Sequence, residues 1–186
     1  MNTIDNPADR FVVITGGPGS GKSTLIAALS QAGCNTSEEV GRQIIKEQVR
    51  IGGKALPWVD PLLFAEMMLS REMHAYGAQA AVQDRVFFDR GVPDVIGYLR
   101  LLGLPVPPHM EKAAELLRYN RRVLIAPPWR DIFGQDSERK QDFDEARRTY
   151  DAMVTTYRDF GYALLELPCA AVDIRLRFVL ETLRQG

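Results

Sequence analysis

The sequence predicts an α/β fold, a parallel sheet of about five strands with helices on both faces. Short apolar runs, typical of buried strands, alternate along the chain with longer segments of helical periodicity. The first of these runs leads into a glycine-rich loop and then into a helical segment. The chain of 186 residues is long enough for one continuous core, so we expect a single domain over residues 1–186.

The glycine-rich loop carries the phosphate-loop (P-loop) signature G-x-x-x-x-G-K-[ST], also called Walker A, at residues 16–23. Glycines let backbone N–H groups converge on a polyphosphate, and the following helix adds the positive end of its dipole. Lys22 would bind the β- and γ-phosphates, and the Ser23 hydroxyl would bind Mg²⁺. The alternative is a glycine-rich turn without a ligand, but packing gives no reason for Gly-Lys-Ser after a buried strand. The sequence therefore predicts a P-loop NTPase fold that binds ATP and Mg²⁺ through Gly16, Gly17, Pro18, Gly19, Ser20, Gly21, Lys22, Ser23 and Thr24.

Periodic apolar residues, with prolines before and glycines after them, place the helices. Pro61 and Pro93 begin two helices, and Gly33 and Gly161 follow the ends of two others. The expected helices comprise residues 24–29, 41–49, 62 to about 83, 95–102, 110–119, 143–157 and 172–183. On two of them we expect these residues to face the core: Met67, Met68, Met73, Ala113, Leu116 and Leu117.

Short apolar runs rich in β-branched and aromatic residues place the strands. Pro127 and Pro128 close the fourth run, because proline cannot donate to a sheet ladder. Right-handed crossovers bring the functional ends of all strands to the C-terminal edge of the sheet, where residues 51–58 should form a rim loop. The expected strands comprise residues 11–15, a short stretch within 34–40, 85–90, 122–126 and 162–168.

Composition excludes several classes of protein. The net charge is −1, from 23 basic and 24 acidic residues, so we expect no nucleic-acid partner. Cys34 and Cys169 lie far apart in the sequence and read as reduced thiols of a cytoplasmic protein. The polar N-terminal residues do not resemble a signal peptide, and no apolar run approaches the length of a membrane span. The sequence leaves the oligomeric state open.

Asp89 ends the third apolar run, Val-Phe-Phe, and is the second candidate for the site. A carboxylate is costly to bury, so it needs a partner or a solvated position. In a P-loop fold that partner is the Mg²⁺ bound by Ser23, directly or through water. The alternative is that Asp89 caps the next helix or pairs with Arg90.

Three further stretches carry a resemblance. They are Phe-Phe-Asp-Arg-Gly-Val-Pro-Asp-Val-Ile-Gly-Tyr at residues 87–98, Pro-Pro-Trp at 127–129 and Asp-Ser-Glu-Arg-Lys-Gln-Asp-Phe at 136–143. Together they resemble a bacterial predicted-ATPase (AAA-type) family related to the ribosylnicotinamide-kinase domain of NadR, within the nucleoside- and nucleotide-kinase branch of P-loop proteins. The resemblance covers nearly the whole chain. It implies that Asp89 serves the metal or the acceptor hydroxyl and that Arg90 binds phosphate.

The same resemblance implies a catalytic base and a lid. Glu39 is the candidate base that activates the acceptor hydroxyl, with Arg42 one helical turn away; the alternative is a solvated helix N-terminus. Residues from 129 to about 141 correspond to a lid, in which Arg139 would stabilise the transferring phosphoryl group. Arg147 and Arg148 fit a solvated helix face better.

We therefore expect an ATP- and Mg²⁺-dependent kinase that phosphorylates a hydroxyl of a nucleoside, nucleotide or vitamin-like molecule. The alternatives are an ATP-dependent switch that acts through a protein partner and, less favoured, a toxin-like kinase of a sugar nucleotide. Arginines supplied by the chain itself favour a kinase over a switch. The sequence does not identify the small-molecule acceptor, or whether Glu39 or Asp89 is the base. The expected catalytic residues are Lys22, Asp89, Arg90, Glu39 and Arg139.

Overall fold

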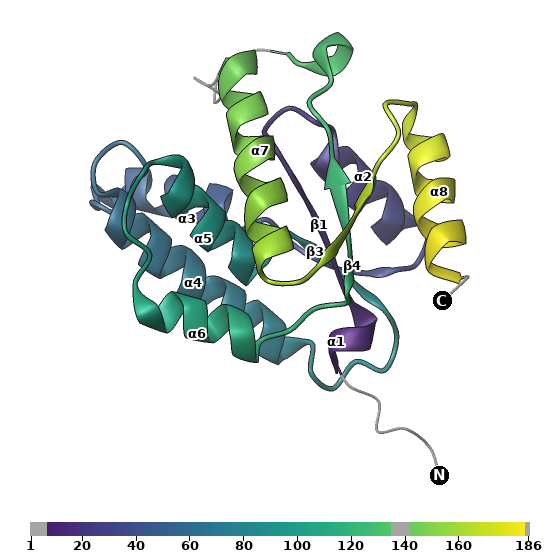
Figure 1. Cartoon of the computed structure of the whole chain (residues 1–186), viewed down its shortest axis with the longest axis horizontal. Coiled ribbons are helices and arrows are strands. Elements are labelled where there is room, and N and C mark those ends of the chain that lie inside the picture. The colour runs from purple at the N-terminus through teal and green to yellow at the C-terminus, as the bar shows by residue number, and fades with distance from the viewer. Residues whose placement is uncertain (1–6, 135–141, 185–186) are drawn as a thin grey trace.

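The computed structural model describes residues 7–134 and 142–184. Its centre is a five-stranded sheet in which every pair of neighbouring strands is parallel, with the order β2-β3-β1-β4-β5 (Figure 1). The predicted fold class is confirmed. The strands are β1 (Phe11–Gly16), β2 (Asn35–Ser37), β3 (Val86–Asp89), β4 (Arg122–Ala126) and β5 (Ala163–Glu166).

Helices cover both faces of the sheet (Figure 1). On one face α2 and α8 pack over the side chains of Val12 and Ile14; on the other, α4 to α7 pack over Phe11 and Val13. This alternation along β1 explains why all its residues are buried. The helices are α1 (Pro7–Arg10), α2 (Lys22–Gln31), α3 (Val40–Ile51), α4 (Pro61–Ala78), α5 (Val92–Leu101), α6 (Pro108–Leu116), the 3₁₀ helix η1 (Arg130–Ile132), α7 (Phe143–Asp159) and α8 (Val172–Arg184).

The register of the sheet determines where the site forms. Ile14 pairs with Asp89 of β3, and Gly16 pairs with Ala126 of β4. The C-terminal ends of the three central strands therefore lie side by side. The loop after β1 and the segment after β3 leave the sheet at the same edge, as crossover topology predicts.

Helix α4 ends earlier than the sequence predicts. It stops at Ala78 instead of about residue 83, because the amide groups of Gln79, Ala80 and Val82 form turns with the carbonyl groups three residues earlier. Val82 then packs against the core and directs the chain into β3. The helical periodicity of the apolar residues does not reveal this turn.

Two packing predictions were wrong. Met73 is 45% exposed and Leu116 is 67% exposed. On α6 the buried stripe contains Met110, Ala113 and Ala114, and Leu116 lies off this stripe. On α4 the buried residue next to Met73 is Glu72, a charged side chain that a count of apolar residues does not select.

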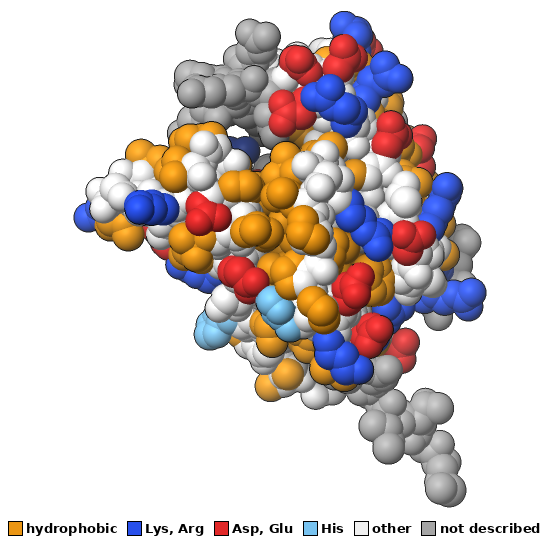
Figure 2. Space-filling view, turned by 60° about the vertical axis from the view of Figure 1, so that its left-hand side comes forward, with side chains coloured by type: hydrophobic (Ala, Val, Ile, Leu, Met, Phe, Trp, Pro, Cys, Tyr) orange, Lys and Arg blue, Asp and Glu red, His pale blue; other side chains and the backbone are white. Residues whose placement is uncertain are grey.

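Exposed apolar side chains gather on the side of the molecule formed by α3 to α6, which Figure 2 turns forward. They are Val49, Ile51, Trp58, Val59, Leu62, Leu63, Met73, Leu102 and Leu116. Within residues 7–134 and 142–184, none of the helices combines the length and the apolar content that a membrane span requires.

Candidate functional site

The phosphate loop connects β1 to α2 and is packed closely against its neighbours. Gly16 has φ of 131°, and a Cβ there would lie 2.4 Å from the carbonyl oxygen of Ala126. A Cβ on Gly17 would lie 2.3 Å from the carbonyl oxygen of Ala146 in α7. Both positions therefore require glycine for steric reasons, in addition to any requirement for ligand approach.

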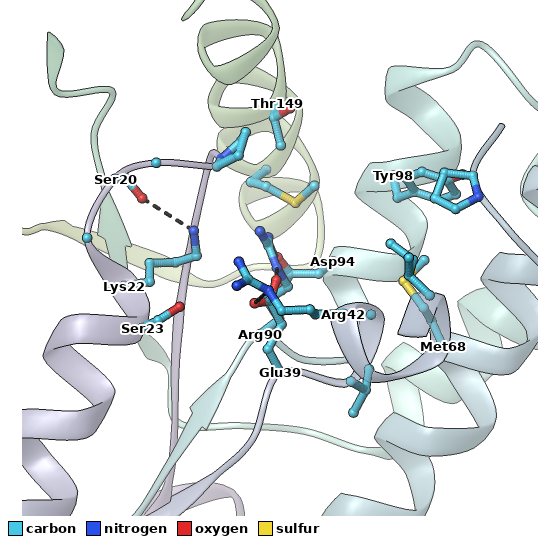
Figure 3. A pocket seen from close by; sticks show the side chains of 18 of the residues that line it. Ser20, Lys22, Ser23, Glu39, Arg42, Met68, Arg90, Asp94, Tyr98 and Thr149 are labelled. Carbon is cyan, nitrogen blue, oxygen red and sulfur yellow. Dashed lines mark hydrogen bonds and ion pairs between the residues drawn. The ribbon is translucent and has the colours of Figure 1, made fainter. Parts of the chain in front are cut away.

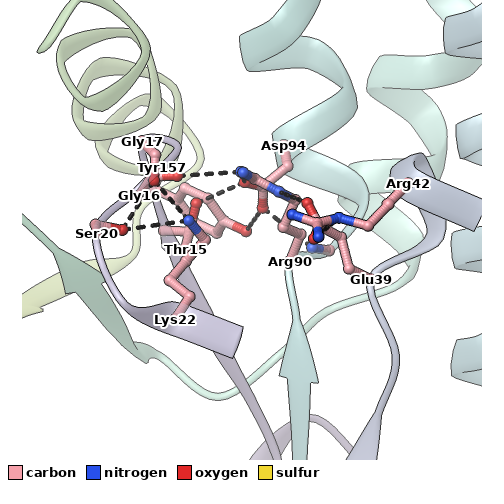
Figure 4. A network of polar contacts seen from close by, with 11 residues as sticks. Thr15, Gly16, Gly17, Ser20, Lys22, Glu39, Arg42, Arg90, Asp94 and Tyr157 are labelled. Carbon is pink, nitrogen blue, oxygen red and sulfur yellow. Dashed lines mark hydrogen bonds and ion pairs between the residues drawn. The ribbon is translucent and has the colours of Figure 1, made fainter. Parts of the chain in front are cut away.

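Lys22 is the first residue of α2, and its side chain is buried inside the loop. Its Nζ donates to the carbonyl oxygen of Gly17 at 2.6 Å and to Ser20 Oγ at 3.3 Å (Figures 3 and 4). Burial, followed by the charge of Arg90, lowers the pKa of Lys22 to about 7. An anion in the loop would reverse this effect, because it favours the charged ammonium group.

Arg90 follows β3 and lies at the centre of a polar network (Figure 4). Its φ is 75°, the only positive value for a non-glycine residue in the described chain, and its amide donates to the carbonyl oxygen of Ile14 at 3.1 Å. Nη1 donates to the carbonyl oxygen of Gly16 at 3.2 Å and to Asp94 Oδ1 at 3.1 Å. Nε donates to Glu39 Oε1 at 3.4 Å. The guanidinium thus joins the phosphate loop to the start of α3.

Asp94 holds Arg90 and is a site residue that the sequence analysis missed. It is 6% exposed, and each of its oxygens accepts two hydrogen bonds. Thr15 Oγ1 and Arg90 Nη1 donate to Oδ1, at 2.5 and 3.1 Å. Tyr157 Oη and the amide of Gly91 donate to Oδ2, at 2.5 and 3.0 Å. The available signal was an acidic residue at the third position of a helix, which predicts a cap but not this network.

Asp89 ends β3, and its side chain is buried. Among the described residues its Oδ1 has no hydrogen-bond partner. Burial, and then the charge of Glu39, raises the pKa of Asp89 to about 6.

Asp89 and Ser23 line one small cavity of about 380 Å³. The described residues contain no cluster of three or more His, Cys, Asp or Glu side chains that could hold a metal. Magnesium in nucleotide sites, however, binds one or two carboxylates together with phosphates. A cavity lined by both a serine and a carboxylate that has one unpartnered oxygen fits that arrangement.

Glu39 is the N-cap residue of α3, but its side chain forms no capping hydrogen bond. It lies instead near two guanidinium groups, with Oε1 3.4 Å from Arg90 Nε and Oε2 3.8 Å from Arg42 Nε. Burial opposes ionisation of Glu39, but the charges of Arg90, Lys22 and Arg42 outweigh it and lower the pKa. Glu39 is therefore an ionised carboxylate directed at the centre of the site.

One large cavity of about 1250 Å³ extends from the phosphate loop to α3, α4 and α5. Figure 3 shows Lys22 and Ser20 on one side of it, Met68 and Tyr98 on the other, and Arg90 between them. The far compartment has mainly apolar walls, which include Ile45, Val49, Trp58, Phe64, Met68, Val95 and Leu102.

Two polar groups of this far compartment were also missed. Glu72 is 3% exposed, and burial, then the charge of Asp94, raises its pKa well above the ordinary value. The hydroxyl of Tyr98 is buried without a hydrogen-bond partner in the described chain, and burial raises its pKa to about 12. Glu72 belongs to no motif, and Tyr98 ends the stretch 87–98 but had no role assigned to it.

The expected lid is only partly described. Arg139 lies outside the described residues. In the described part, η1 begins at Arg130, whose guanidinium lies 4.3 Å from the centre of the Phe143 ring. Arg147 and Arg148 are exposed on α7, with Arg147 Nη1 3.8 Å from Asp144 Oδ1, as the predicted solvated face requires.

Comparisons with known proteins identify a family and a fold. A family model described as an AAA domain matches residues 11–175. No curated protein matches the chain.

Several solved structures share the fold. A deoxyadenosine kinase from M. mycoides, with products dCMP and a flexible dCDP bound, has a TM-score of 0.70 at 13% identity and covers 95% of this chain and 100% of its own. NadR in complex with NR has a TM-score of 0.72 at 17% identity and covers 96% of this chain, which matches 50% of NadR. Thymidylate kinase from Ehrlichia chaffeensis has a TM-score of 0.61 at 15% identity, over 96% and 100% of the two chains.

Proposed function

This chain belongs to the AAA domain family, and we propose that it is an ATP- and Mg²⁺-dependent kinase that phosphorylates a hydroxyl of a small molecule. The observation that carries the proposal is the shape of the main cavity. It occupies about 1250 Å³, and its two ends differ in character: a phosphate loop and an apolar compartment. Sites for one small ligand occupy about 300–1000 Å³. A cavity of this size and polarity suits two substrates that meet near Arg90.

The end of the cavity at the phosphate loop has groups that can bind the phosphates, the metal ion and the phosphoryl group in transfer. Backbone N–H groups of the loop and Lys22 would bind the phosphates of ATP. Ser23 and Asp89 would hold Mg²⁺, which supplies charge neutralisation when bound. Arg90 lies at the boundary of the two compartments and would stabilise the phosphoryl group in transfer. Its positive φ and its bonds to Asp94 and Glu39 hold it ready for that role.

Glu39 is the proposed base. Its lowered pKa keeps it ionised at neutral pH, and it borders the same cavity as Arg90. Asp89, whose pKa burial raises to about 6, remains the alternative. A Glu39→Gln variant separates the two: turnover should fall by about 10²-fold or more with ATP affinity unchanged. A variant with the parent's turnover would leave Asp89 as the base.

The acceptor compartment suits a molecule with a flat, largely apolar body. Aromatic and sulfur-containing side chains, Phe64, Tyr98 and Met68, form its walls. The structures of two neighbours in fold contain dCMP and NR, so nucleosides and nucleotides are the first acceptors to test. The rival function, a switch that hydrolyses ATP for a protein partner, gives no role to this second compartment.

The test is acceptor-dependent release of ADP. Purified protein is incubated with ATP, Mg²⁺ and a panel of nucleosides, nucleotides and vitamin-like alcohols, and the phosphorylated product is identified by mass spectrometry. We expect one class of acceptor to accelerate ADP release and to gain one phosphoryl group. ADP release that no acceptor changes, with only inorganic phosphate formed, would favour the switch.

A further inference from the structure

Arg175 is a buried cation that has no role in the kinase mechanism proposed above. It lies in the N-terminal part of α8, is 3% exposed, and lines the large cavity beside the phosphate loop. Nη1 donates to the carbonyl oxygen of Ser20 at 2.9 Å. This is the one hydrogen bond that the Arg175 side chain makes to the part of the chain that the structure describes, and its Nε is buried without an acceptor. A guanidinium has five N–H donors, so most of its donors are unused.

The surroundings of Arg175 disfavour a positive charge. Among residues 7–134 and 142–184 it forms no ion pair, whereas Arg177 on the same helix lies 3.7 Å from Asp173. Burial lowers the pKa of Arg175 from its ordinary value. Arg175 also lies toward the positive end of the α8 dipole, and the loop it contacts precedes the positive end of α2. A bound anion would supply the missing ion pair, favour the charged guanidinium despite its burial, and counter the positive ends of both helix dipoles.

Close packing places this guanidinium directly on the loop. A Cβ on Gly21 would lie 2.6 Å from Arg175 Nη1. Lys22 approaches the loop from inside, and Arg175 approaches it from α8, which the chain reaches only after β5. The two cations therefore come from opposite ends of the sequence and meet at one loop.

We propose that Arg175 is a nucleotide-binding residue whose guanidinium contacts the phosphates of the nucleotide in the loop. The inference rests on the proposed nucleotide site but not on transfer to an acceptor. The bond to the Ser20 carbonyl orients the guanidinium, and the remaining donors bind phosphate oxygens.

The experiment is a calorimetric titration with ADP, without acceptor, of the parent and of Arg175→Gln, Arg175→Lys and Arg175→Ala. Arg177→Ala is the control, because it removes an exposed arginine from the same helix. Gln and Lys keep a donor for Ser20 and therefore separate charge from support of the loop. Loss of a charge-assisted contact should weaken ADP binding about 10- to 100-fold in the Gln and Ala variants, with a smaller loss for Lys. Adenosine, which has no phosphate, should bind all variants equally.

Three of the following outcomes would overturn the inference, and one would refute the kinase proposal alone. If Arg175→Gln binds ADP like the parent, the role of Arg175 is only to support the loop, even if Arg175→Ala binds ADP weakly or does not fold. Equal losses for ADP and adenosine would place its role away from the phosphates. A parent that binds ADP but phosphorylates no acceptor would refute the kinase proposal and leave the Arg175 titrations interpretable. A parent that binds no nucleotide would refute both.

Discussion

The Asp94→Asn substitution tests the polar network at its centre. Asp94 Oδ1 and Oδ2 each accept from two donors, and an asparagine side chain has one oxygen. If the amide nitrogen replaces Oδ1, it faces the guanidinium of Arg90, which cannot accept. If it replaces Oδ2, it faces the amide of Gly91, which cannot accept either. Thr15 and Tyr157 can rotate their hydroxyl groups, so one donor–donor conflict remains in either orientation.

The magnitude follows from these contacts. Breaking a buried ion pair costs about 3–5 kcal/mol, and an unsatisfied buried donor costs about 1–3 kcal/mol. Arg90 retains Glu39 and the Gly16 carbonyl oxygen, so we take the lower end, about 3 kcal/mol. For a domain of this size that corresponds to a melting temperature lower by about 6–12 °C.

Urea denaturation of the ligand-free protein measures the difference. The control is Asp159→Asn, because Asp159 pairs with Arg100 at 2.7 Å but its side chain is 54% exposed. An exposed pair contributes about 0–1 kcal/mol. If Asp94→Asn lost no more free energy of unfolding than Asp159→Asn, the network would not be a stabilising element, and the argument that it positions Arg90 would fail.

Three further predictions concern the titratable groups of the site. Lys22→Ala should weaken ATP binding about 10- to 100-fold in calorimetry without lowering the melting temperature, and unchanged affinity would refute the loop assignment. The pKa of Lys22 is lowered to about 7, and a bound anion should raise it again. ATP binding by the parent at pH 8 should therefore take up protons, which calorimetry detects as a binding heat that depends on the buffer. For the same reason, the affinity for ATP should fall as pH rises above 7. Glu72→Gln should stabilise the protein above pH 4.5, measured as the free energy of unfolding in urea. Because the pKa of Glu72 is raised in the folded state, the carboxyl group ionises at lower pH in the unfolded state, and the parent loses stability as pH rises. A stabilisation by Glu72→Gln that does not grow with pH would contradict this.

The sequence predicted the parts of the site that are local in the chain. Residues 16–24 form a P-loop because strand, glycines and helix are consecutive, and Asp89 follows its own strand directly. The positions of β1, β3, β4 and β5 could be read from short apolar runs, whereas β2 is the polar stretch Asn-Thr-Ser, which was expected only somewhere within residues 34–40. The exact ends could not: α4 stops at a turn that depends on Val82 packing into the core.

The missed residues share a physical cause. Asp94 takes donors from β1 and α7, and Arg175 takes its acceptor from the loop before α2. These partners are distant in sequence, so no spacing rule connects them. Glu72 is an acidic residue on a helix, which composition alone assigns to the surface. Its burial results from α4 packing against α5 beside the cavity.

The strand order has a consequence for how the chain folds. β1 is made first but lies in the middle of the sheet, and its neighbours are β3 and β4. During synthesis, at about 5–20 residues per second, the apolar segment from Phe11 to Ile14 therefore waits several seconds for its first partner, Val86 to Asp89. Such non-local pairing slows folding, and an unpaired apolar strand is prone to aggregate. The segment that carries the phosphate loop should accordingly be the one that most needs a chaperone while the chain is incomplete.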